Sequence, residues 1–129
     1  MRRALLCGAL FCSLGTAQTR LIESIKGPAL YQAYCASCHG VDGTGGGPMA
    51  KSLKVAPTDL TRIAARSGGM FPLAGVSQII TGEKAVPGGH GTREMPVWGP
   101  IFSQVDADQD LGRMRIDNLA RYLREIQKP

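Results

Sequence analysis

The chain has 129 residues, enough for one small domain, and its 15 basic and 10 acidic side chains give a formal net charge of +5. No apolar run approaches the roughly 20 residues that a membrane-spanning helix needs, so we expect no stable membrane span. The basic residues form no cluster interleaved with stacking aromatic side chains, and we therefore expect no nucleic-acid partner.

The N-terminus has the organisation of a secretory signal peptide. Arg2 and Arg3 form a charged start, a short apolar run follows, and Gly15-Thr16-Ala17 supplies small residues at the cleavage positions. We expect a signal peptide at 1–17, a mature domain at 18–129 and a periplasmic or secreted location. The apolar run is short for an uncleaved membrane anchor.

The first helix of the mature chain is expected from about Pro28 to Ala36, because proline suits the first helical position. This helix leads into Cys35-Ala36-Ser37-Cys38-His39, which has the pattern C-x-x-C-H. The pattern is typical of covalent attachment of a c-type haem. Cys35 and Cys38 would add to the two vinyl groups on one edge of the porphyrin, and His39 would be the proximal iron ligand.

Three other sites can use a pair of cysteines at this spacing: a zinc half-site, a redox dithiol and a structural disulfide. Zinc needs a second pair of ligands, but Cys7 and Cys12 lie in the expected signal peptide and the only other histidine is His90. A thioredoxin-like dithiol would follow a strand-rich segment, and none precedes Cys35. The pattern therefore favours haem.

The middle of the chain alternates glycine-rich loops with short helices. Gly40–Pro48 lacks the strand and the Lys-Ser/Thr pair of a phosphate-binding loop, and we expect it to wrap closely around the proximal side of a haem. Thr58 or Asp59 is expected to cap a short helix, and Gly82 to end a longer one. The helices expected in this region cover residues 49–54, 60–66 and 73–81.

The last helix is expected from about Arg115 to Lys128. An apolar stripe at helical spacing marks its buried face, formed by Ile116, Leu119, Leu123 and Ile126. The charged residues between them, with Arg115 among them, are expected on the outer face. Because no strong strand pattern occurs anywhere, the predicted class is all-α, with three to five short helices and long loops.

From Gly27 to about residue 127 the sequence resembles a class I cytochrome c of bacterial type, which carries a single haem. In that family a glycine and an aromatic residue on the N-terminal helix cross a leucine and an aromatic residue on the C-terminal helix. Gly27 and Tyr31 match the first pair, and Leu119 and Tyr122 match the second. The resemblance implies the cytochrome c fold around one covalent haem c.

The resemblance also implies a second axial ligand and a partner for the first. The family places a methionine before a proline late in the chain, which matches Met95 in Met-Pro-Val-Trp-Gly. A methionine ligand raises the reduction potential relative to a second histidine. By the same resemblance, the carbonyl of Pro48 would accept the Nδ1 hydrogen of His39. His90 is the competing axial ligand, and core packing is expected for Met114.

We therefore expect a periplasmic carrier of single electrons rather than an enzyme. Two alternatives stay open: a haem subunit of a dehydrogenase or oxidase complex, and a haem enzyme or gas-binding protein with an open sixth site. The expected partners are redox proteins with an acidic docking face, since basic residues flank the expected pocket: Lys51, Lys54, Arg62, Arg66, Lys84 and Arg93.

Overall fold

The computed structural model describes residues 24–85, 95–104 and 109–129. These residues form six α-helices and two short 3-10 helices, with no strand among them. The predicted all-α class is therefore confirmed. The helices, in chain order, are α1 Gly27–Tyr34, α2 Ala36–His39, η1 Ala50–Ser52, η2 Leu60–Arg62, α3 Ile63–Arg66, α4 Leu73–Thr81, α5 Trp98–Gln104 and α6 Gln109–Glu125.

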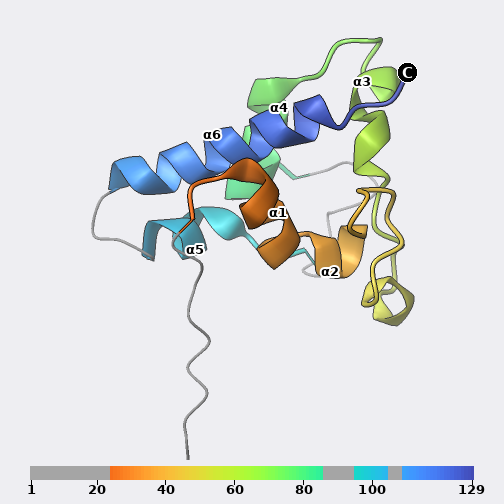
Figure 1. Cartoon of the computed structure of the whole chain (residues 1–129), viewed down its shortest axis with the longest axis horizontal. Helices are drawn as coiled ribbons and strands as arrows, with labels where there is room; N and C mark the ends of the chain where they lie inside the picture. Colours follow the sequence, from red (N-terminus) through yellow and green to blue (C-terminus); the bar gives the residue numbers. More distant parts are fainter. Residues whose placement is uncertain (1–23, 86–94, 105–108) are drawn as a thin grey trace, which may run out of the picture.

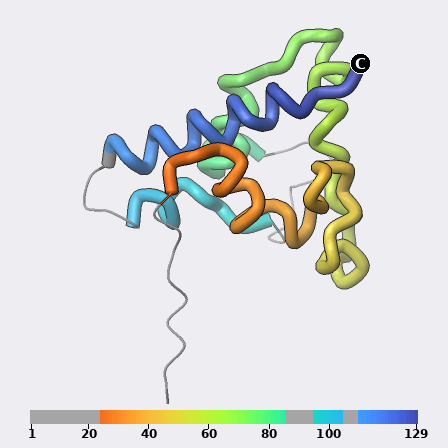
Figure 2. The backbone as a smooth tube through the Cα atoms, in the orientation of Figure 1, coloured from red at the N-terminus to blue at the C-terminus, as the bar shows by residue number. Residues whose placement is uncertain are grey.

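Helix α6 is the longest element, and α1, α4 and α5 all pack against it (Figure 1). In the tube view, α1 and α2 follow each other on one side of α6, and the glycine-rich loop continues from them (Figure 2). The chain end returns to η2, where the amide of Lys128 donates a hydrogen bond to the Thr61 carbonyl at 2.8 Å. No helix in the described ranges is long and apolar enough to cross a bilayer.

The predicted crossing of the first and last helices is present. A Cβ atom at Gly27 would lie only 2.7 Å from Cβ of Tyr122 and would overlap the Asn118 carbonyl group, so α1 and α6 approach closely only because residue 27 has no side chain. The Tyr31 and Tyr122 rings lie 5.4 Å apart and tilted, beside the fully buried Leu119. These four residues fix the angle at which α1 crosses α6.

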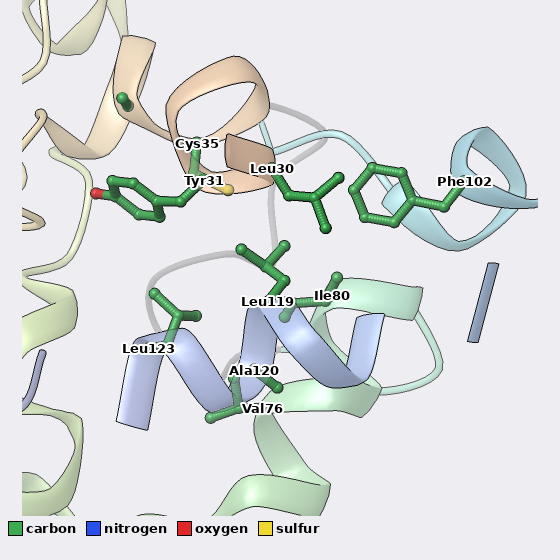
Figure 3. Close-up of a cluster of buried hydrophobic side chains, with 10 residues drawn as sticks. Leu30, Tyr31, Cys35, Val76, Ile80, Phe102, Leu119, Ala120 and Leu123 are labelled. Carbon is green, nitrogen blue, oxygen red and sulfur yellow. The ribbon is translucent and has the colours of Figure 1, made fainter. Parts of the chain in front are cut away.

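The core is a small cluster of side chains from α1, α4, α5 and α6. In Figure 3, Leu30 from α1 and Phe102 from α5 point toward each other, and Leu119 and Ile80 lie beneath them. Leu30, Phe102 and Leu119 are each 0 % exposed. Helix α5 was not predicted, although its Phe102 is central to this cluster.

Several predicted boundaries agree with the structure, while the bounds of the last helix and the exposure of Arg115 need correction. Helix α4 matches the prediction and ends at Gly82, whose backbone is left-handed. The last helix begins at Gln109, earlier than predicted, and ends at Glu125. Arg115 was expected on the outer face of that helix but is 1 % exposed, with Nη1 donating to the Phe102 carbonyl at 3.3 Å.

Candidate haem-binding site

Cys35 lies at a joint between two helices. Helix α1 ends at Tyr34, Cys35 takes φ −110° and ψ −38°, and α2 begins at Ala36. The Cys35 carbonyl then accepts the amide of His39 at 2.9 Å, so the backbone makes one tight turn between the two cysteines and the histidine. This turn explains how three side chains so close in sequence reach the wall of one cavity.

That cavity has a volume of about 300 Å³ and contains the side chains on which the haem prediction rests. Cys35, Cys38 and His39 line it, and so does Met95, which lies much later in the chain. Most of the remaining wall is apolar, contributed by the 53–63 segment, α4 and α6, with Leu53, Leu60, Ile63, Val76, Ile79, Ile80, Leu119 and Leu123 among its residues. An apolar pocket with a few convergent polar groups is the usual form of a cofactor site.

The two cysteines are free thiols rather than a disulfide. Burial and, to a smaller extent, the neighbouring Cys38 raise the pKa of the Cys35 thiol to about 12. Cys35 is therefore held as a neutral thiol against the apolar wall. In the part of the chain that the structure describes, no group of three or more His, Cys, Asp or Glu side chains is placed to hold a metal ion.

The orientation of His39 is fixed by a backbone carbonyl, but not by the predicted one. Its Nδ1 lies 3.0 Å from the Thr58 carbonyl oxygen, and the side chain is 6 % exposed. A carbonyl oxygen only accepts hydrogen bonds, so this contact places the proton on Nδ1 and leaves the lone pair on Nε2. A neutral imidazole in that form is the one that can bind iron.

The predicted partner, Pro48, lies elsewhere. The amides on either side of it bind the end of α2: Gly47 donates to the Cys38 carbonyl at 3.1 Å, and Met49 donates to the Ser37 carbonyl at 2.9 Å. Gly47 can approach so closely because it has no Cβ atom, which would lie only 2.7 Å from the Ala36 carbonyl oxygen. Pro48 is exposed and does not line the cavity, so the prediction for Pro48 is wrong.

Met95 is half-buried and lines the cavity together with Pro96 and Trp98. The other described methionines are placed differently: Met49, Met70 and Met114 are 50 %, 78 % and 44 % exposed, and none lines the cavity. Core packing was expected for Met114, and its exposure contradicts that expectation. His90, the competing ligand, lies outside the described residues.

An aromatic cluster supports the wall beside Met95. The Tyr34 ring lies 5.1 Å from that of Trp98 and 5.1 Å from that of Phe102, and Trp98 stacks on Phe102 at 6.0 Å. Tyr34 precedes Cys35, whereas Trp98 follows Met95 by three residues. The cluster therefore connects the backbone that carries the thiols to the backbone that carries the methionine.

The sequence model of the family described as cytochrome c oxidase, cbb3-type, subunit III matches residues 24–123. The chain belongs to this family. No curated protein and no solved structure matches it. As a member of this family the chain is a c-type cytochrome that carries covalently bound haem c, and its helices form the cytochrome c fold.

The donor set in the cavity fits that cofactor. Two thiols could supply the atoms for covalent attachment, a neutral imidazole could supply a nitrogen ligand, and a thioether from a distant part of the chain could supply sulfur. Of the residues that the motif analysis selected, Cys35, Cys38, His39 and Met95 are brought together. Thr58 was proposed only as a possible helix cap, and nothing in its sequence context indicated that it would orient His39.

Proposed function

We propose that this cytochrome transfers single electrons through one haem attached to Cys35 and Cys38, with His39 and Met95 as axial ligands. The observation that supports the proposal best is the position of Met95: although far from His39 in sequence, it lines the same apolar cavity. When bound, the haem iron supplies one-electron exchange between its ferric and ferrous states.

The residues of the chain have separate tasks in this proposal. Thr58 holds His39 in the tautomer whose Nε2 would be free to bind iron, and Pro96 stiffens the backbone beside Met95. The apolar wall excludes water from the metal. With both axial positions taken by side chains, no substrate needs to bind iron, and the chain is proposed to act as a carrier rather than as an enzyme.

We further propose that the signal peptide at 1–17 is removed and that residues 18–129 act outside the cytoplasmic membrane. Export fits the motif, because thiols meet haem for covalent attachment outside the cytoplasm. Within that setting the protein is proposed to be a small carrier that meets its partners by diffusion.

A second candidate is a haem subunit held in an oxidase complex, and the description of the family as an oxidase subunit favours it. Affinity purification of tagged protein from its native membranes distinguishes the two. A carrier should elute alone at moderate salt, whereas a subunit should bring stoichiometric partner chains with it.

The attachment of haem is tested with Cys35→Ala, Cys38→Ala and the double substitution, expressed in the periplasm with the haem-attachment machinery. Each single variant should lose one thioether, and the double variant should show no haem stain on a denaturing gel. Ser37→Ala, at an exposed position between the cysteines, serves as the control and should stain like the wild type. Undiminished staining of the double variant would contradict the proposed site.

A further inference from the structure

The wall of the haem cavity has an uneven charge. Arg66 and Lys84 line it, and among the described lining residues there is no aspartate or glutamate. The other titratable side chains of the wall are Tyr34 and the three residues of the attachment motif. Both side chains are exposed overall, so their charges lie at the solvent edge of a pocket that is otherwise largely apolar.

Arg66 is held in place by the same segment that orients His39. The Thr58 carbonyl oxygen faces His39 Nδ1 at 3.0 Å, and the next carbonyl, that of Asp59, accepts a hydrogen bond from Nη2 of Arg66 at 2.7 Å. A guanidinium group has five N–H donors in a planar arrangement, and this bond uses one of them. The side chain is thereby anchored at the mouth of the cavity with further donors left to bind a carboxylate.

Lys84 reaches the wall from a different element. Helix α4 ends at Gly82, and the amide of Lys84 donates to the Gln78 carbonyl at 3.1 Å, which folds the chain back over the last turn of the helix. Lys84 is exposed overall but still lines the cavity. Such a side chain can keep its ammonium group in water while its stem lies along an apolar wall.

We propose that Arg66 and Lys84 bind the two propionate carboxylates of the haem and thereby raise its reduction potential. The inference rests on the proposed function, because it assumes the haem in this cavity. The charge balance carries it: haem has two carboxylates, and the described wall offers two cations and no acid, while Asp59, whose carboxylate interacts with the charge of Arg66, lies outside the lining. Arg66, already anchored, suits the planar, bidentate mode in which arginine binds carboxylates.

The pairing has two electrical consequences. Cations near the haem stabilise the state with the more negative charge, which is the ferrous state, so they raise the potential. They also favour ionised propionates, because an opposite charge nearby lowers a carboxyl pKa. A plot of the reduction potential against pH has an inflection where a propionate titrates. Because the cations lower the propionate pKa, they keep this inflection at low pH.

The test compares Arg66→Gln and Lys84→Gln with wild type by redox titration of the holoprotein between pH 4 and 9. Each variant should have a lower reduction potential at neutral pH. The inflection in its plot of potential against pH should move upward by about one pH unit, which is the lower end of the pKa shift that a nearby opposite charge causes. Arg66→Lys keeps the charge and should restore most of both values. Lys51→Gln removes an exposed cation that does not line the cavity and should change neither value.

The outcomes separate this inference from the proposed function. Haem staining and the ferric near-infrared spectrum are recorded for every variant, and a wild type without covalent haem would overturn the function itself. If Arg66→Gln and Lys84→Gln retain haem and titrate like Lys51→Gln, the propionate pairing is wrong while the function stands. If Arg66→Gln fails to fold, Lys84→Gln decides by the same comparison.

Discussion

At the scale of single residues, Asp59 shows how a small motif positions the site. Its carboxylate accepts hydrogen bonds from the Thr61 hydroxyl at 2.6 Å and the Thr61 amide at 2.8 Å, which caps η2 directly after Thr58. The hydroxyl bond first, and then the amide bond and the charge of Arg66, hold the pKa of Asp59 below its usual range. The ionised carboxylate is therefore the stabilising form.

Asp59→Ala should lower the free energy of unfolding by about 1 kcal/mol at neutral pH, the usual cost of losing a helix N-cap. Because the folded-state pKa is lowered, this contribution is complete above the unfolded-state pKa and is lost as the pH falls through the folded-state value. Urea titrations of wild type and variant between pH 7 and pH 2.5 measure the difference. A difference that stays constant over this range would contradict the role of the ionised carboxylate.

Arg115 carries a buried charge whose role is structural. Besides its bond to the Phe102 carbonyl, its Nε donates to the Ser24 carbonyl at 3.4 Å, so one side chain ties α6 to α5 and to the segment before α1. Arg115→Met keeps the length of the side chain but removes its hydrogen-bond donors. It should lower the free energy of unfolding by about 1 to 3 kcal/mol, the penalty for unsatisfied buried acceptors.

The matched control for Arg115 is Arg121→Met on the same helix. Arg121 is exposed and forms a surface ion pair with Asp117 at 3.4 Å, so Arg121→Met should change the free energy of unfolding by no more than about 0.5 kcal/mol. Equilibrium urea denaturation of both variants provides the comparison. Equal losses in the two variants would show that burial of Arg115 contributes nothing to stability.

At the scale of elements, the crossing of α1 and α6 depends on one glycine. Gly27→Ala should destabilise the protein by about 1 to 3 kcal/mol, as overpacking does, because the methyl group would meet the α6 backbone. Gly46→Ala is the control, since no heavy atom lies within 4 Å of the Cβ position there, and it should change stability little. Thermal melts of the holoproteins test both; a neutral Gly27→Ala would mean that the helices can move apart freely.

The elements also show where sequence reasoning succeeds and where it fails. Helix α4 was predictable because its apolar spacing is a local signal, and the α1–α6 crossing was predictable from the resemblance to class I cytochromes c. Helix α5 was missed because Gly99 and Pro100 interrupt any propensity signal, although proline is tolerated in a first turn. Its stability comes instead from the packing of Trp98 and Phe102 on Tyr34.

Within the site, the residues proposed to carry chemistry could be selected from the sequence, whereas those that orient them could not. The motif and the Met-Pro pair mark Cys35, Cys38, His39 and Met95 by residue type and order. The partner of His39 is a backbone carbonyl, which any residue has, so only the path of the chain could select Thr58 over Pro48. For the same reason the burial of Arg115 could not be read from a helical pattern.

At the scale of the whole molecule, the basic residues that flank the cavity make a prediction about partners. If the basic residues around the cavity guide an acidic redox partner, the bimolecular rate of electron transfer should fall steeply as salt rises. Exposed charges are largely screened beyond a Debye length of about 8 Å at physiological ionic strength. Stopped-flow rates at increasing ionic strength test this, and a rate independent of salt would leave these residues only a solubilising role.

The central claim is that the iron is held between His39 and Met95, and the ferric near-infrared spectrum tests it most directly. The wild type should show the charge-transfer band of a sulfur–iron bond. Met95→Ala should lose that band while keeping covalent haem, and its potential should drop because the thioether favours ferrous iron. His90→Ala should keep both band and potential. If His90→Ala instead loses its low-spin spectrum and Met95→Ala does not, the axial assignment is contradicted.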